Sequence, residues 1–156
     1  MNRMMIDIET LDTAVTAQVT QVAWVIDEAG VTRSHQHWNV TPVHGRTESQ
    51  DTLKWWLEQD VKPYDPNQPY ISADDLASLL ANQMEDVEEV WANPPHFDIA
   101  ILNDLLRPHG YEVPHRKARC LRTLVAHTGT ARIDAAIPHN PLSDCYAQIE
   151  TLRAVG

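Results

Sequence analysis

Residues 4–10 read MMIDIET, and this stretch contains both a fold signal and a chemical problem. Side chains on a β-strand point alternately to its two faces. The stretch therefore predicts a strand that separates two sets of residues, Met4, Ile6 and Ile8 on one face and Met5, Asp7 and Glu9 on the other. Residues two apart on a strand lie about 6.6–7 Å from each other, so Asp7 and Glu9 would share one side of a sheet.

Two carboxylates on one face repel each other. A buried pair of this kind either raises one pKa steeply or binds cations, and its hard oxygen ligands suit Mg²⁺ or Mn²⁺. The structural alternative is an edge strand whose acidic face is solvated. The short motif by itself leaves both interpretations open.

Extended patterns dominate the residues that follow. Residues 21–30 form an apolar run that ends in a turn signal, and residues 31–40 resume an extended pattern. Together with residues 4–9, they predict two or three antiparallel strands near the N-terminus.

Helical and strand patterns alternate in the rest of the chain. Residues 51–60 predict a helix that a proline-rich loop ends. Ser72 and Asp75 resemble a capping box before a helix whose apolar positions are Leu76, Leu79, Leu80, Met84 and Val87. A strand over 88–93, a helix over 97–110, and a strand or turn leading into a helix over 119–129 follow. Asn140 and Pro141 begin a terminal helix whose expected buried face is Leu142, Tyr146, Ile149 and Leu152.

This order predicts an α/β fold with a mixed central sheet, in which an antiparallel N-terminal strand group is flanked by helices. The chain has 156 residues, of which 43% are hydrophobic. A length in this range is typical of one domain, so we expect residues 1–156 to form a single domain.

Charge and cysteine content narrow the classes of function. The net charge of −10 argues against a protein that coats nucleic acid or an anionic membrane. An acidic cleft neutralised by divalent cations is still compatible with local binding of nucleic acid. No apolar run is long enough for a membrane span or a secretory signal, so we expect a cytoplasmic protein with no membrane partner. Cys120 and Cys145 are expected to be reduced, packing thiols.

Three more residues have a chemical alternative to an ordinary structural role. Asp98 opens the predicted helix over 97–110, where a carboxylate also complements the helix dipole. Asp144 lies on the predicted terminal helix, five residues after His139. Taken singly, these residues read as a helix-capping acid, a surface acid and a loop histidine.

Taken in order, the chemical positions resemble a known family. Asp7-x-Glu9-Thr10, then Phe97-Asp98 after Asn93, then His139-x-x-x-x-Asp144 is similar to the three motifs of the DEDDh 3′–5′ exonucleases, which have a ribonuclease-H-like fold. TLKWWLEQ, at 52–59, and RCLRTL, at 119–124, also resemble segments of a small bacterial and phage branch. Many members follow the first motif with a glycine-containing turn, whereas this chain has Leu11 and Asp12.

The resemblance implies a role for each matching residue. Asp7 would bridge two divalent cations, Mg²⁺ or Mn²⁺, with Glu9 and Asp144 completing the first site and Asp98 holding the second through water. Two such ions can stabilise the attacking and the leaving oxygen of phosphodiester cleavage. His139 would be the general base, since an imidazole ordinarily titrates near neutral pH. The implied substrate contacts are Thr10, Leu11, Asn93 and Phe97.

The resulting expectation is a metal-dependent 3′–5′ exonuclease that acts on the 3′ ends of single-stranded DNA or RNA and releases nucleoside 5′-monophosphates. The alternatives are an exoribonuclease or oligonucleotidase of the same fold, and a non-catalytic nucleic-acid-binding module. A homodimer is expected from the compact size and the resemblance to small family members.

Other residues allow weaker hypotheses. His35 and His37 share a strand face and could bind zinc, although no third ligand is recognisable, and the alternative is an exposed polar face. Trp55 and Trp56 could stack on bases, but adjacent helical residues diverge, so at least one should belong to the core. The basic stretch at 115–122 could meet phosphates or be a solvated loop.

Overall fold

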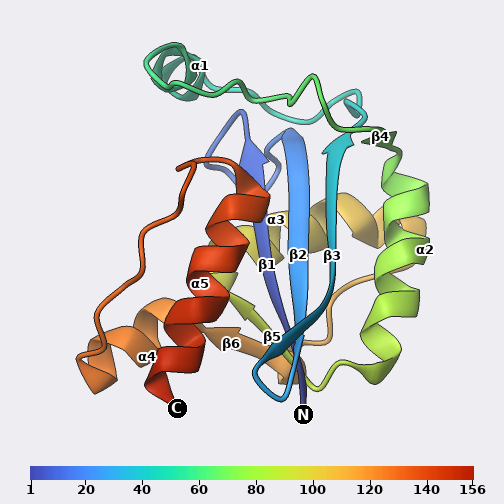
Figure 1. Cartoon of the computed structure of the whole chain (residues 1–156). Coiled ribbons are helices and arrows are strands. Elements are labelled where there is room, and N and C mark those ends of the chain that lie inside the picture. The colour runs from blue at the N-terminus through green and yellow to red at the C-terminus, as the bar shows by residue number, and fades with distance from the viewer.

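The computed structural model describes residues 1–156 and is organised around a mixed sheet of six strands (Figure 1). The strands lie side by side in the order β4-β3-β2-β1-β5-β6. Their bounds are β1 Asn2–Thr10, β2 Val19–Glu28, β3 Val31–Val40, β4 Tyr70–Ile71, β5 Glu89–Ala92 and β6 Ala118–Cys120.

The first three strands form an antiparallel meander, as the sequence predicts. β1 pairs with β2 and β2 with β3, and the turn between the last two contains Ala29 and Gly30. Both residues have positive φ, 51° and 84°, as in the two-residue turns that match strand twist. β5 then pairs in parallel with β1, and β6 in parallel with β5. The predicted mixed sheet with an antiparallel N-terminal group is confirmed.

Helices cover both faces of this sheet. Figure 1 shows α5 in front of β1 and β2, and α3 behind the sheet. α2 and α3 pack with Met4, Ile6 and Ile8, whereas α4 and α5 pack on the face that carries Met5. The helix bounds are α1 Gln50–Leu57, α2 Ala73–Gln83, α3 Pro95–Leu106, α4 Leu121–Thr128 and α5 Pro141–Val155, with short 3₁₀ turns at Met84–Asp86, Arg107–His109 and His115–Lys117. None of the helices combines the length and apolar character needed to cross a membrane.

The position of β1 decides between the two interpretations of its carboxylates. β1 lies between β2, which pairs along its whole length, and β5, which pairs with Arg3–Met5, and the Ile8 N–H farther along bonds to Asp98, so β1 is an interior strand. The edge-strand alternative is therefore wrong. Asp7 and Glu9 lie on the face covered by α5, at the half of the strand farthest from the chain termini.

Some predicted boundaries and faces differ in the structure. The helix expected over 51–60 ends at Leu57, and the helix expected over 97–110 runs from Pro95 to Leu106 before a 3₁₀ turn and the left-handed Gly110. Leu142 and Tyr146 are only half-buried, while the buried set on α5 also includes Cys145, Ala147 and Thr151. Small side chains fill this face because α5 lies directly on the sheet.

Candidate active site

Asp7 and Glu9 come from the second half of β1. Glu9 is 9% exposed, and Asp7 is half-buried with one carboxylate oxygen, Oδ2, shielded from solvent. Ile8, between them, points into the opposite core and is itself buried. The apolar side chains on one face of β1 therefore pack in the core and hold the strand in place, while Asp7 and Glu9 lie on the opposite face.

Asp98 reaches the same region from the first turn of α3. Its side chain is buried, with 3% of the residue exposed, and its Oδ1 accepts a hydrogen bond of 3.1 Å from the backbone N–H of Ile8. The helix-capping alternative is not what the structure shows, because the N-cap residue is Pro94 and Asp98 bonds to β1 instead. Asp98 therefore ties α3 to the strand between the two other acids.

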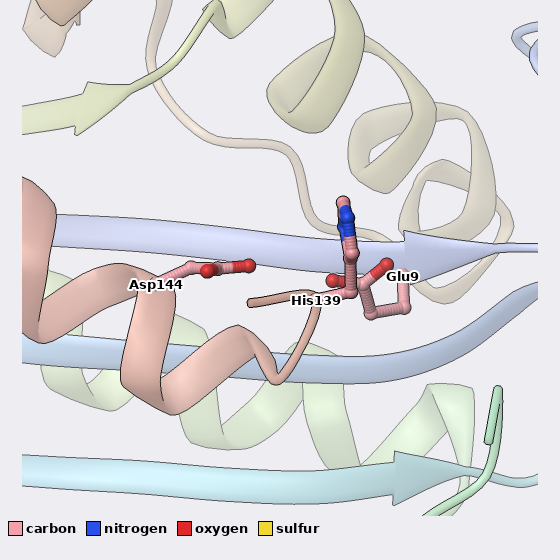
Figure 2. A group of neighbouring side chains, drawn as sticks. All are labelled: Glu9, His139 and Asp144. Atoms are coloured by element: carbon pink, nitrogen blue, oxygen red, sulfur yellow. The ribbon is translucent and has the colours of Figure 1, made fainter. Parts of the chain in front are cut away.

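Asp144 and His139 come from the start of α5. Asn140 caps this helix by accepting a 3.1 Å hydrogen bond from the Ser143 N–H, and the Asp144 N–H donates to the Asn140 carbonyl at 2.9 Å. His139, just before the cap, has φ of 65°, a left-handed conformation that few residues other than glycine adopt. Figure 2 shows Glu9 on β1 beside His139 and Asp144, and ligand atoms of these three residues lie within 4.8 Å of one another.

The electrostatics of the four carboxylates are those of a crowded, buried anionic cluster. Burial and the neighbouring Asp98, Glu9 and Asp144 raise the pKa of Asp7 well above its ordinary value. Burial, followed by the charges of Asp144 and Asp98, does the same to the pKa of Glu9.

The other two acids are also shifted. Burial raises the pKa of Asp98 to about 7, although the Ile8 N–H opposes this. Burial raises the pKa of Asp144 to about 6, and His139 opposes the shift. These raised pKa values mean that the ionised forms of the four acids are unfavourable in the folded protein. Positive charge bound nearby would stabilise the ionised forms.

The donor set fits hard divalent cations. The buried Oδ2 of Asp7 has no hydrogen-bond partner, which is uncommon for a buried carboxylate oxygen. The side-chain amide of Gln148 lies close enough to lower the Asp7 pKa without forming a hydrogen bond of ordinary geometry. Four neighbouring carboxylates, one with a buried oxygen that has no partner, match the all-oxygen coordination that Mg²⁺ and Mn²⁺ prefer.

A cavity of about 560 Å³ opens beside Glu9. Two of the predicted substrate contacts, Thr10 and Phe97, line it, together with Ile8, Asp12, Thr13, Ser49, Asp51, Thr52 and Trp55. Leu11 does not line it, because its side chain is buried and its backbone bonds to Gln18 and Ser49. Asn93 lies elsewhere, in a second cavity of about 410 Å³ that also reaches Asp144 and Gln148.

The structure bears on the hypothesis that His35 and His37 bind zinc. His37 is buried and bonds to Gln21 Oε1 at 2.8 Å, so the expected exposed polar face is wrong for this residue. His35 instead contacts the hydroxyl of Tyr146 at 2.8 Å. The zinc hypothesis gains no third ligand, since the group of potential metal ligands in the chain is Glu9, His139 and Asp144.

The tryptophan pair divides as expected. Trp56 is 5% exposed and its Nε1 donates to the Thr10 carbonyl at 2.8 Å, whereas Trp55 is 38% exposed and reaches His139. The basic stretch forms a 3₁₀ turn, β6 and the start of α4, from which the charge of Arg122 lowers the pKa of Asp98.

Two residues near the site carried no signal in the sequence motifs. Gln148 follows Asp144 by four positions on α5, so helical geometry places it on the same side of the helix. The spacing of four residues from Asp144 was the signal in the sequence that could have indicated Gln148. Glutamine is common on helices, so this spacing alone does not point to a site. Arg122 could be noticed only as part of a basic stretch, and its proximity to Asp98 depends on the pairing of β5 with β6.

Comparison with solved structures identifies the fold class. The Escherichia coli exonuclease I complex with a dT13 oligonucleotide matches with a TM-score of 0.77 at 12% identity, over 99% of this chain and 40% of that one. Exonuclease I from Methylocaldum szegediense matches with a TM-score of 0.74 at 13% identity, over 99% and 40%. The chain thus spans about two fifths of these proteins' length and shares their ribonuclease-H-like fold.

Comparison with families is more specific. The model of the 3′–5′ exoribonuclease Rv2179c-like domain matches residues 2–155, so the chain belongs to this family. The description of this family agrees with the resemblance of the sequence motifs to the DEDDh 3′–5′ exonucleases. No curated protein matches the chain by sequence.

Proposed function

We propose that this protein is a metal-dependent 3′–5′ exonuclease that removes nucleotides from single-stranded 3′ ends and releases nucleoside 5′-monophosphates. One observation carries the proposal. The Asp7 carboxylate lies close enough to Glu9, Asp98 and Asp144 for their charges to raise its pKa, and its buried Oδ2 has no hydrogen-bond partner. Such an arrangement is unfavourable unless cations bind there.

The residues that would hold two Mg²⁺ or Mn²⁺ ions are Asp7, Glu9, Asp98 and Asp144. When bound, a pair of ions stabilises negative charge on the attacking and leaving oxygens of a phosphodiester. The chain contributes rigid support for these ligands. Asp98 is fixed to β1 by the Ile8 N–H, and Asp144 is fixed by the first turn of a capped helix.

His139 is the proposed general base. It is half-buried at the mouth of the cluster, and its ring nitrogen lies within 4.8 Å of carboxylate oxygens of Glu9 and Asp144. From this position the imidazole can take a proton from a water molecule that attacks the scissile phosphorus. Such a positioned base typically contributes about 10²–10⁴-fold to turnover.

The cavity of about 560 Å³ is the proposed site of the 3′-terminal nucleotide. Phe97 and Trp55 give it apolar surface suited to a base, and the hydroxyl-bearing residues Thr10, Thr13 and Ser49 also line it. A single unpaired nucleotide fits a recess of this kind, whereas a base pair would have to open first. The similar structure of exonuclease I in complex with a dT13 oligonucleotide supports a single-stranded substrate.

RNA is the proposed preferred substrate, because the matched family is described as exoribonuclease. The test uses 5′-labelled RNA and DNA oligomers of one sequence, incubated with Mn²⁺ or with EDTA. We expect a ladder of products shortened from the 3′ end, faster for RNA, and no products in EDTA. Asp7→Asn is the matched inactive control. Internal fragments, or equal activity of Asp7→Asn, would contradict the proposal.

Three other expectations stay predictions. They are that residues 1–156 form one domain, that the protein assembles as a homodimer, and that it is located in the cytoplasm. Sedimentation of the purified chain, with and without a single-stranded oligomer, measures the second directly.

A further inference from the structure

The ring of His139 has an aromatic neighbour and no hydrogen-bond partner. Its centroid lies 4.7 Å from that of Trp55, with an interplanar angle of 84°, an edge-to-face contact. No hydrogen bond to either ring nitrogen of His139 occurs in the structure. A general base is usually oriented by a third group that bonds to it, and this site contains no such group.

Trp55 is itself held in place by the strand that carries the carboxylates. Its ring packs edge-to-face on Trp56 at 5.1 Å and 79°. Trp56 in turn donates its Nε1 proton to the carbonyl of Thr10 at 2.8 Å, in a buried position. The start of α1 is fixed nearby, because the Ser49 N–H donates to the Leu11 carbonyl at 2.9 Å.

This chain of contacts connects the end of β1 to the imidazole. Figure 1 shows α1 at the end of the molecule opposite the termini, away from the other helices. The helix buries only Trp56, so it contributes little to the core. Its exposed residue Trp55 nevertheless faces the cavity beside Glu9 and Phe97.

We propose that Trp55 is a positioning residue for His139, holding the imidazole over the carboxylate cluster through the Trp56–Trp55–His139 ring contacts. The inference rests on the proposed role of His139 as general base.

The test compares Trp55→Ala with Trp55→Phe, and uses Leu57→Ala as a control. Leu57 lies on the same helix and is 86% exposed. We expect Trp55→Ala to lower kcat by about 10–10²-fold, the effect of a misplaced catalytic group, with KM on the oligomer unchanged. Trp55→Phe should restore most of the loss, since it keeps a ring, and Leu57→Ala should behave as wild type. Binding of the oligomer in Ca²⁺, measured by anisotropy, should be the same in all four proteins.

A double-mutant cycle separates positioning from base stacking. If Trp55 acts through His139, Trp55→Ala should cause no further loss of kcat in a His139→Ala background. A raised KM with unchanged kcat, weaker binding in Ca²⁺, or an equal loss in both backgrounds would overturn the inference. An active wild type with an unaffected Trp55→Ala variant would refute this inference alone, whereas an inactive wild type would refute the proposed function as well.

Discussion

At the scale of single residues, the site depends on side chains that are ordinary one at a time. Asp98 illustrates this, because a carboxylate in the first turn of a helix is usually a dipole or capping residue. Here it accepts from the Ile8 N–H on a strand 90 positions earlier in the sequence. That contact could not be predicted from the sequence around Asp98. Only the order of all five chemical positions indicated that these residues meet.

His139 supports a residue-scale prediction that separates chemistry from binding. His139→Ala removes the proposed base but leaves the four carboxylates, so turnover should fall by about 10²–10⁴-fold. Affinity for a single-stranded oligomer in Ca²⁺ should stay near that of wild type. Single-turnover kinetics and fluorescence anisotropy measure the two quantities. Normal cleavage by the variant would make the histidine a bystander, and loss of Ca²⁺-dependent binding would make it a ligand.

At the scale of secondary-structure elements, those with a repeating sequence pattern could be predicted, and those set by contacts with distant residues could not. The β1–β3 meander and α2 follow from alternation, turn residues and the Ser72 cap, whose Oγ accepts from the Asp75 N–H at 3.1 Å. β4 has two residues and was not predicted, because it is set by pairing with β3 rather than by its own sequence. The place of α1 was equally unpredictable, since ring contacts with His139 and a bond to Thr10 determine it.

The cap of α5 gives the element-scale prediction. Asn140→Ala removes the acceptor for the Ser143 N–H and should destabilise the protein by about 1 kcal/mol, lowering Tm by about 2–4 °C for a chain of this length. It should also lower kcat, because His139 and Asp144 flank the cap. Ser72→Ala is the matched control, since it uncaps α2 away from the carboxylates. A similar Tm loss with unchanged kcat in both variants would show that the α5 cap has no special link to catalysis.

At the scale of the whole molecule, the fold of this acidic protein brings four carboxylates, which repel one another, into one cluster. The net charge of −10 does not by itself indicate nucleic acid as a partner. The fold nevertheless brings β1, α3 and α5 together so that four acids meet, and their raised pKa values show that the folded state is unfavourable for their charged forms. This feature could not be derived from composition, because it depends on which acids become buried.

The pH dependence of stability follows from these shifts. The folded pKa values of about 7 for Asp98 and about 6 for Asp144 exceed the value of about 3.9 expected in the unfolded chain. Between these values the native state binds more protons than the unfolded state, so the free energy of unfolding falls as pH rises. In EDTA, the contribution of these groups should therefore lower Tm between pH 5.5 and pH 8.

Asp98→Asn is the control for this prediction, because the amide oxygen can still accept from the Ile8 N–H. The variant should lose less Tm than wild type across the same pH interval. Millimolar Mg²⁺ or Mn²⁺ should raise the wild-type Tm most at pH 8, where the carboxylates are ionised. Parallel Tm curves for the two proteins in EDTA would show that Asp98 is not held at a raised pKa.

The most direct test of the central claim is a calorimetric titration of Mn²⁺ into the wild-type protein and into Asp7→Asn at pH 8. We expect saturable binding of two ions to wild type, because the carboxylates are ionised at this pH and supply hard oxygen ligands. Asp7→Asn removes the central charge and should abolish or strongly weaken this binding while the protein stays folded. Equal Mn²⁺ binding by the two proteins, or none by wild type, would contradict the assignment of the carboxylate cluster as the metal centre of this protein.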